Sequence, residues 1–229
     1  MLENYKKHVA DRAEQNIPPL PLDADQTSEL IELLKKDHQE SDFLLDLLKE
    51  RVPAGVDQAA YVKAAFLADI TTGKASSPYI TKIDAVRILG TMLGGYNIQP
   101  LIECLKDNEL AEAAAHVLSR TLLIFDAFNE IFELSKTNEH AKKVVEEWAN
   151  ATWFTEKTDI EEQIKLTVYK VTGEINTDDL SPAPDAWSRP DIPLHALAMF
   201  KMPRTGLDDP LGTIEKLKEK GNPLVFVLS

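Results

Sequence analysis

The feature that most constrains the fold is a proline-rich run, GEINTDDLSPAPDAWSRPDIPL, which extends from Gly173 to Leu194. Proline fixes φ and has no N–H to donate, so the prolines at positions 182, 184, 190 and 193 oppose a regular helix or strand. Irregular segments of this length inside compact domains are usually functional or disordered. Because regularly patterned segments flank the run, we predict an ordered, functional loop.

Residues upstream of the run, up to about 155, repeat their apolar positions with the period of an amphipathic helix. Asp and Thr are favoured N-caps, so helices are expected to begin after Asp23, Asp57 and Thr81, with Gly94 and Gly95 ending the last of these. Further helices are expected over 1–14, 108–134 and 139–150. Short helices with short connections are typical of stacked hairpins, which predicts a HEAT-like superhelix over residues 1–160.

The pattern changes near residue 160. Residues 163–173 (QIKLTVYKVTG) are rich in β-branched and aromatic side chains and predict a strand, with Leu166, Val168 and Val171 facing inward. After the proline-rich run we expect short helices from Pro193 and from Ile214, then a strand over 224–228. This order predicts a small α/β domain over residues 161–229. A sheet of one or two parallel strands buries little, so we expect this domain to be incomplete, or truncated.

Composition narrows the class of protein. The chain has 229 residues and a formal net charge of −13, and residues 1–162 hold 17 Lys and Arg against 29 Asp and Glu. Nucleic-acid affinity depends on Lys and Arg contacts to phosphate, so this acidity argues against direct RNA binding. No apolar run reaches the length of a membrane span, and the N-terminus lacks the apolar core of a signal peptide. We expect a cytoplasmic protein.

Metal and nucleophile motifs are absent from the sequence. The five histidines are scattered, and the single cysteine, Cys104, lies on an apolar helical face where a buried structural thiol is expected. One thiol can form neither an internal disulfide nor the usual ligand set of an iron–sulfur cluster. No G-x-S-x-G, P-loop or G-x-G-x-x-G pattern occurs. We therefore predict no catalytic residue, metal site or cofactor site in the chain itself.

The proline-rich run also carries a family resemblance. Residues 177–183 (TDDLSPA) resemble the signature that opens the swivelling domain of aconitases, and 176–199 is close to the form in bacterial aconitate hydratase B. Residues 51–67 (RVPAGVDQAAYVKAAFL), 89–102 (LGTMLGGYNIQPLI) and the N-terminal 24 residues resemble the helical domain of the same family. Ile175 departs from the family pattern, in which threonine is usual. Enzymes of this family are several times longer than this chain.

The resemblance implies a function and a set of site residues. The family interconverts citrate and isocitrate through cis-aconitate at a [4Fe–4S] cluster, and its cluster-free form is linked to mRNA binding. Its helical domain implies a surface for protein partners or a homodimer. Arg189 is the position that the resemblance assigns to a substrate carboxylate, whereas the sequence alone also allows Arg189 to pair with Asp185 or Asp191. The motif residues expected to shape the loop are Thr177, Asp178, Asp179 and Ser181.

Two hypotheses follow for the chain as a whole. In the first, it is the N-terminal part of an aconitate hydratase B, inactive by itself because cluster cysteines and the catalytic serine loop lie elsewhere. In the second, it is a stand-alone helical interaction module without enzymatic function. The retained motif around Arg189 favours the first hypothesis, because an interaction scaffold has no use for a carboxylate-binding arginine.

Overall fold

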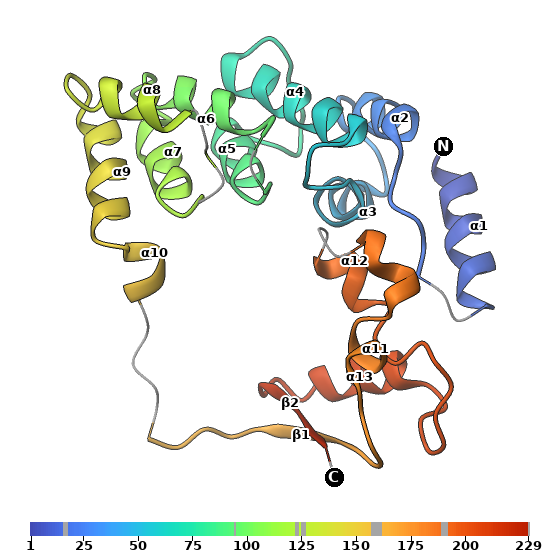
Figure 1. Cartoon of the computed structure of the whole chain (residues 1–229). Helices are drawn as coiled ribbons and strands as arrows, with labels where there is room; N and C mark the ends of the chain where they lie inside the picture. Colours follow the sequence, from blue (N-terminus) through green and yellow to red (C-terminus); the bar gives the residue numbers. More distant parts are fainter. Residues whose placement is uncertain are drawn as a thin grey trace. The chain divides into compact units, whose positions relative to one another are not determined.

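The computed structural model describes residues 1–15, 18–93, 95–121, 124, 127–156, 162–188 and 192–228. The chain divides into two compact units, Met1–Asn4 with Leu20–Lys157 and Tyr5–Pro19 with Thr158–Ser229. Most of the described secondary structure is helical, and a small parallel sheet lies in the second unit (Figure 1). The predicted mainly α fold is therefore confirmed.

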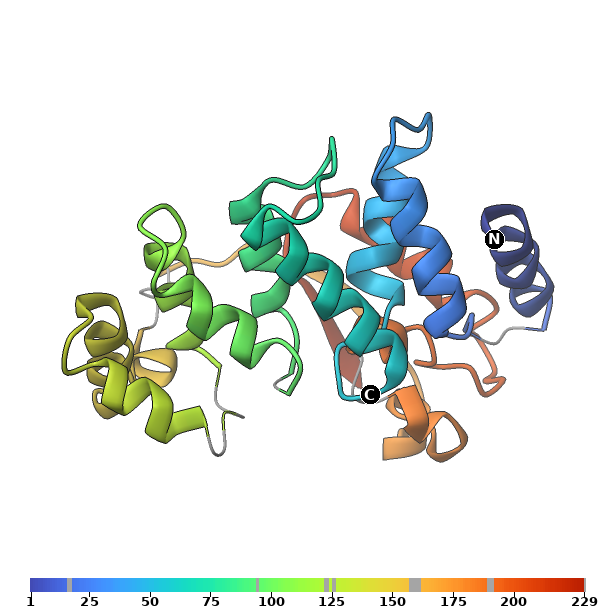
Figure 2. The same ribbon diagram turned by 90° about the horizontal axis from the view of Figure 1, so that it is seen from above.

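The first unit is a succession of helices that pack against near neighbours in sequence. α2 contacts α4, α4 contacts α5, α5 contacts α7 and α7 contacts α9. Each helix therefore packs against helices that are close to it in sequence, and together they form a row (Figure 2). Its elements are α2 (Ala24–Leu34), α3 (Ser41–Asp46), the π-helix η1 (Leu47–Arg51), α4 (Gln58–Thr72), α5 (Lys82–Gly90), α6 (Ile98–Cys104), α7 (Ala111–Leu118), α8 (Ala127–Leu134), α9 (Glu139–Ala149) and α10 (Thr152–Thr155). The preceding helix α1 (Leu2–Ala13) crosses the division between the units.

Three predicted N-caps are confirmed. Asp23 accepts from the N–H of Gln26, Asp57 from that of Ala60 and Thr81 from that of Asp84. Each bond spans three residues and satisfies a donor that the first helical turn leaves unpaired. The start of each helix is therefore encoded in its own first turn.

Two predicted helix ends are wrong. α5 stops at Gly90, before Gly95, because the buried Asn97 amide donates to the carbonyl of Leu89 at 2.8 Å and takes the place of a further turn. Gly94 lies outside the described residues.

The expected single helix over 108–134 is instead α7 and α8. The carbonyl of Leu118, the last residue of α7, accepts from the Trp148 indole N–H at 3.1 Å. In both cases a side chain from a later segment bonds a carbonyl at the helix end.

The second unit contains a two-stranded parallel sheet. β1 (Thr167–Val171) pairs with β2 (Leu224–Leu228) in the register Thr167↔Leu224 to Val171↔Leu228. Tyr169 and Val171 are buried with Phe200 and with Ile214 of α13 (Pro210–Lys218). α13 begins earlier than predicted, because Asp209 caps it and Pro210 occupies its first turn, where no N–H is needed. Both predicted strands are confirmed, although β1 covers only the middle of the predicted range 163–173.

The predicted inward face of β1 is wrong. Leu166 and Val168 are 47% and 53% exposed, whereas Thr167, Tyr169 and Val171 are buried. Successive residues of a strand point to opposite faces, so Val168 and Val171, three residues apart, cannot share one. The Tyr169 ring packs edge-on against Phe200 at 6.5 Å between centroids, and this aromatic contact fixes which face is inside.

The proline-rich run is more regular than predicted. It contains α11 (Thr177–Leu180) and the 3₁₀ helix η2 (Ala183–Ser188), neither of which was predicted. The helix predicted from Pro193 is confirmed as α12 (Ile192–Ala196), which begins inside the run. Proline is tolerated in the first turn of a helix, where its missing N–H has no intrahelical acceptor. Pro184 and Pro193 are each the second residue of their helix, where a proline is tolerated. Placed later in the helix, either proline would interrupt it.

Candidate functional site

The candidate site is the first part of the proline-rich run, Asn176–Ser188, which we call the motif loop. Asn176 begins it as the N-cap of α11, and its side-chain oxygen accepts from the N–H groups of Asp178 and Asp179. The Asp179 carboxylate accepts in return from the Asn176 N–H at 2.9 Å. This reciprocal capping box holds a helix of only four residues.

Asp179 is the most heavily bonded of the four predicted motif residues. It is 7% exposed, and its Oδ2 lies 2.8 Å from Arg204 Nη1. Arg204 Nη2 also donates to the carbonyls of Thr172 and Glu174. The Asn176 N–H and the Arg204 guanidinium together lower the pKa of the Asp179 carboxyl. Arg204 therefore ties the end of β1 to the first turn of the motif loop.

The other three predicted motif residues contribute weaker or shorter-range bonds. The exposed Thr177 supplies a carbonyl that accepts from the Ser181 N–H at 2.7 Å. Asp178 is exposed, and its carboxylate accepts from the Ala183 N–H at 3.2 Å. Ser181 is half-buried, and its Oγ lies 2.8 Å from His195 Nε2. These contacts link α11 to the turn that follows it.

A second segment, His195–Arg204, bonds to the motif loop at several points, and we call it the stapling segment. The Phe200 N–H donates to the Asp179 carbonyl at 2.7 Å. Lys201 Nζ lies 2.8 Å from Asp185 Oδ2, and Asp185 is 3% exposed. His195 and Arg204 add the bonds described above. The two buried carboxylates of the loop are thus each paired with a cation from the stapling segment.

Sequence reasoning did not find the stapling residues. His195, Lys201 and Arg204 bond to partners 14, 16 and 25 residues away. No short spacing between residues in the sequence predicts such pairs. The Asn176-x-x-Asp179 spacing did carry a signal, since it has the form of a capping box. Arg189, the predicted carboxylate contact, lies outside the described residues. Asp185 is bonded to Lys201.

The second unit also holds a cavity of about 560 Å³. Its lining is largely apolar and includes Val9, Pro18, Met199, Phe200, Lys201 and Arg204. Both of these cations already face carboxylates, Lys201 that of Asp185 and Arg204 that of Asp179. The cavity therefore offers poor chemistry for a tricarboxylate.

Neither a metal centre nor a membrane helix emerges from the described parts of the chain. Within the described ranges no three His, Cys, Asp or Glu side chains gather closely enough to hold a metal ion. None of the helices in the described residues has the length and apolar character that crossing a bilayer requires. Cys104 is 4% exposed in α6, as predicted, and burial raises the pKa of its thiol.

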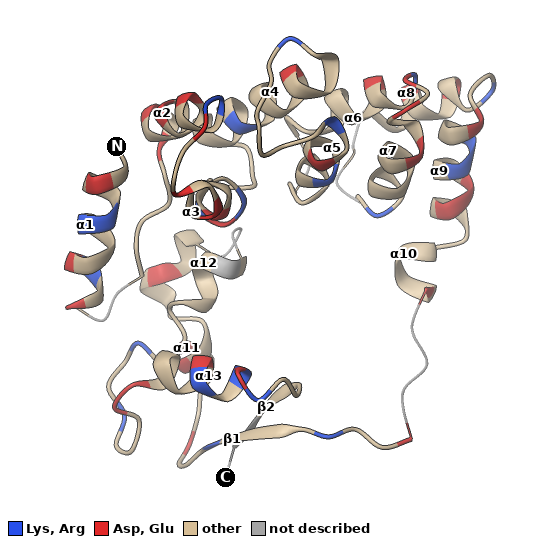
Figure 3. Cartoon of the chain, turned by 180° about the vertical axis from the view of Figure 1, so that it is seen from behind, with Lys and Arg blue, Asp and Glu red and all other residues tan. Residues whose placement is uncertain are grey.

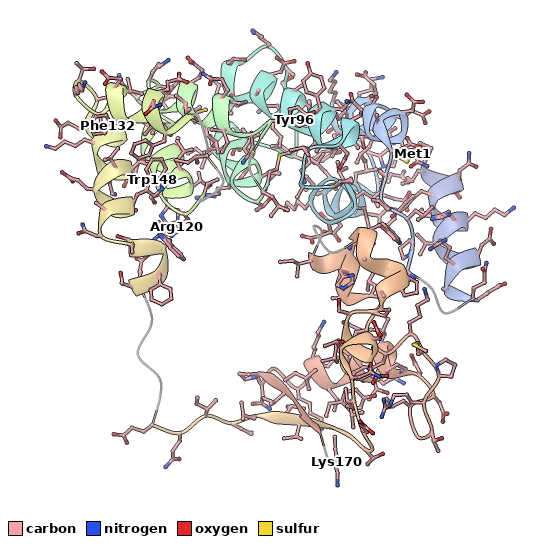
Figure 4. All side chains as sticks on the ribbon, in the orientation of Figure 1. Met1, Tyr96, Arg120, Phe132, Trp148 and Lys170 are labelled. Carbon is pink, nitrogen blue, oxygen red and sulfur yellow. The ribbon has the colours of Figure 1, made fainter. Side chains whose placement is uncertain are left out.

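The far end of the helical unit combines an ion-pair cluster with exposed aromatic side chains. Arg120 follows α7 and points toward α9 and α10, where Nη1 lies 3.6 Å from Glu147 and Nη2 contacts Glu156 (Figure 4). Phe132, Trp153 and Phe154 are 44%, 45% and 58% exposed. Acidic and basic residues interleave along α9 (Figure 3). The charged pairs link the end of α7 to α9 and to the residue after α10, and the aromatic rings leave apolar surface for a contact.

Comparison with known proteins gives consistent matches over nearly the whole chain. Residues 4–154 match the family model of the aconitate B N-terminal domain, and residues 166–229 match that of the aconitate hydratase 2 N-terminus. Aconitate hydratase B of Escherichia coli is 56% identical over 236 residues, which cover 99% of this chain and 27% of that protein. The protein of the same name from Synechocystis is 56% identical and that from Helicobacter pylori 47%, each over 99% of this chain and 26% of the relative. The chain thus spans about a quarter of the length of these relatives.

Proposed function

Because the chain belongs to the aconitate hydratase B family, we propose that it is the N-terminal region of an enzyme that interconverts citrate and isocitrate through cis-aconitate. The observation that carries this proposal is 56% identity to aconitate hydratase B over 99% of the chain. The reaction is that of the tricarboxylic acid cycle, and the proposed location is the cytoplasm. Residues 1–160 would be a HEAT-like domain and 161–229 part of the swivelling domain, in agreement with the separate matches to 4–154 and 166–229.

The proposed role of the second domain is to bind a carboxylate of the substrate through Arg189. Arginine presents a planar fork of N–H donors that matches a carboxylate. Asp185 is bonded to Lys201, which supports a role for Arg189 other than pairing with that carboxylate. The bonds among Thr177, Asp178, Asp179 and Ser181 support their proposed role in shaping the loop that leads to Arg189.

The [4Fe–4S] cluster that the family implies does not fit the residues of this chain. Such clusters need several thiolates, whereas the sequence contains one cysteine. That residue, Cys104, is buried in α6, and its thiol has a raised pKa, so the reactive thiolate is disfavoured. We therefore propose that the chain by itself is inactive. Aconitase turnover by the purified chain after anaerobic treatment with iron and sulfide would contradict this.

A citrate titration tests the substrate role directly. We expect citrate to shift the NMR signals of the motif loop in the 229-residue chain, and Arg189→Gln to remove most of the effect. Arg87→Gln is the matched control, because Arg87 is an exposed arginine on α5 of the helical unit. Equal citrate affinity in the wild type and Arg189→Gln would refute the role of Arg189, and no binding in the wild type would refute the substrate role of the loop.

The exposed aromatic side chains favour a second function, in which the helical unit binds a protein partner or a second copy. Aromatic residues are enriched at the centres of interfaces, and three of them lie on α8 and α10. If the helical unit acts through this surface, Trp153→Ala with Phe154→Ala should lower self-association in analytical ultracentrifugation while Arg189→Gln leaves it unchanged. The reverse result would assign association to the second unit. The acidity of residues 1–162 argues against RNA as the partner.

A further inference from the structure

His195 forms hydrogen bonds through both nitrogens of its imidazole ring. Nε2 lies 2.8 Å from Ser181 Oγ, and Nδ1 lies 2.7 Å from Ser188 Oγ. Ser181 is the C-cap of α11, and Ser188 is the last residue of η2. The ring therefore joins the ends of the two helical turns that make up the motif loop.

The hydrogen bonds of Ser188 determine which ring nitrogen carries a hydrogen. Ser188 is 1% exposed, and its hydroxyl donates to the Asp185 carbonyl at 2.7 Å. A hydroxyl group has one hydrogen, so Ser188 Oγ must accept from the ring, and Nδ1 must be the donor. In the neutral ring Nε2 then has no hydrogen and accepts from the Ser181 hydroxyl.

We infer that His195 is a positioning residue, and that its ring, with a hydrogen on Nδ1, sets the conformation of the motif loop. The rest of the stapling segment bonds to the two buried aspartates, Phe200 and Arg204 to Asp179 and Lys201 to Asp185. His195 bonds to the two serines instead, and so fixes the spacing between α11 and η2. The inference rests on the proposed function in one respect, because the motif loop is the part assigned to the tricarboxylate.

The tautomer of His195 distinguishes the two possible roles of the ring. A ring that only fills space has no reason to keep its hydrogen on Nδ1, whereas a positioning ring does. In the ¹⁵N-labelled 229-residue chain at neutral pH, a long-range ¹H–¹⁵N correlation spectrum distinguishes the two neutral tautomers. The spectrum of His195→Asn identifies the ring among the five histidines, because its signals alone disappear. We expect the Nδ1–H pattern for His195. An Nε2–H pattern, or averaging between the two tautomers, would overturn the inference.

Two half-variants separate the two bonds. Asparagine places an amide near the position of Nδ1 and can keep the bond to Ser188, whereas glutamine reaches the position of Nε2 and can keep the bond to Ser181. The backbone N–H groups to follow are those of Ser181, bonded to the Thr177 carbonyl, and Asp185, bonded to the Pro182 carbonyl. His195→Asn should speed hydrogen exchange mainly at Ser181, His195→Gln mainly at Asp185, and His195→Ala at both.

The expected increase in the exchange rate is about fivefold for each bond lost, in line with the net contribution of one hydrogen bond to stability. Amides of α9, in the helical unit, should not change in any variant and report that the chain is folded. If all three variants exchange like the wild type, His195 does not set the conformation of the loop. If exchange rises equally at both amides in the two half-variants, the two bonds are not separate tethers, and the inference is also overturned.

Citrate titration of the same four proteins distinguishes this inference from the proposed function. If the wild type binds citrate and the variants with fast loop exchange bind it less tightly, the positioning role extends to the substrate. If all four bind with one Kd, the loop conformation set by His195 does not serve binding, and that part of the inference is wrong. If the wild type binds no citrate, the proposed function fails, and the tautomer and exchange results still decide the role of His195.

Discussion

The helical unit and the motif loop are held by different kinds of interaction. In the helical unit, buried leucines and alanines pack between helices that are neighbours in sequence, and N-cap side chains begin α2, α4, α5 and α9. In the motif loop, helical turns of four to six residues are held by ion pairs and hydrogen bonds to a segment as many as 25 residues away. The first region depends on the burial of apolar surface, and the second on polar partners that must all be in place.

The largest effect should come from a cavity in the helical core. Leu89 is fully buried in α5, so Leu89→Ala should cost about 2–5 kcal/mol of unfolding free energy. Ile83→Ala on the same helix is the control. Because Ile83 is 40% exposed, this change should lower the free energy of unfolding much less. Denaturant titration followed by circular dichroism measures both, and equal losses would contradict the assigned core.

A smaller loss should follow from overpacking the contact between α5 and α7. A Cβ added at Gly90 would lie 1.8 Å from Val117 Cγ1 and 2.8 Å from Val117 Cβ, so something must shift. We expect Gly90→Ala to destabilise the helical unit by about 1–3 kcal/mol, whereas Gly55→Ala, which meets nothing within 4 Å, should be close to neutral. A stabilised Gly90→Ala protein in the same titration would show that the two helices are not in close contact.

Removing a cap compares the two regions most directly. Asp57→Ala should cost about 0.5–2 kcal/mol, because α4 loses an acceptor for the Ala60 N–H but keeps its packing. Asn176→Ala removes an acceptor shared by two N–H groups of a four-residue helix with little packing of its own. Hydrogen exchange should therefore show α11 opening locally, with the helical unit unaffected. Retention of α11 without its cap would mean that the stapling segment is sufficient.

The smallest effect should be an acid sensitivity of the motif loop that depends on Asp179. The pKa of Asp179 is lowered by the Asn176 N–H and by Arg204, so its carboxylate stabilises the folded loop fully above the ordinary Asp pKa of about 4. That contribution is lost as the pH falls below this value toward the lowered pKa. Asp179→Asn should flatten the acid limb of loop exchange, whereas Asp84→Asn, which alters the capping box of α5, should not. An unchanged profile in Asp179→Asn would assign the sensitivity elsewhere.

The same contrast explains what the sequence could predict. Caps at Asp23, Asp57 and Thr81 were predicted correctly because donor and acceptor lie three residues apart. The ends of α5 and α7 were not, because the side chains that bond them, Asn97 before α6 and Trp148 in α9, belong to later segments. In the motif loop, Asp179 was expected to shape a turn, and its partner Arg204 could not be seen from local spacing. The role of Arg189 stays a prediction from the family resemblance.

The central claim is that polar bonds from the stapling segment hold the motif loop independently of the helical core. Residue-resolved hydrogen exchange of Arg204→Gln tests this claim most directly. Glutamine keeps a polar N–H group but is shorter, and it provides neither the charge nor the three contacts to Asp179, Thr172 and Glu174. The account predicts faster exchange at the N–H groups of Ser181 and Phe200, with the amides of α4, α5 and α7 unchanged. Unchanged exchange at Ser181 and Phe200, or an equal rise throughout the helical unit, would contradict it.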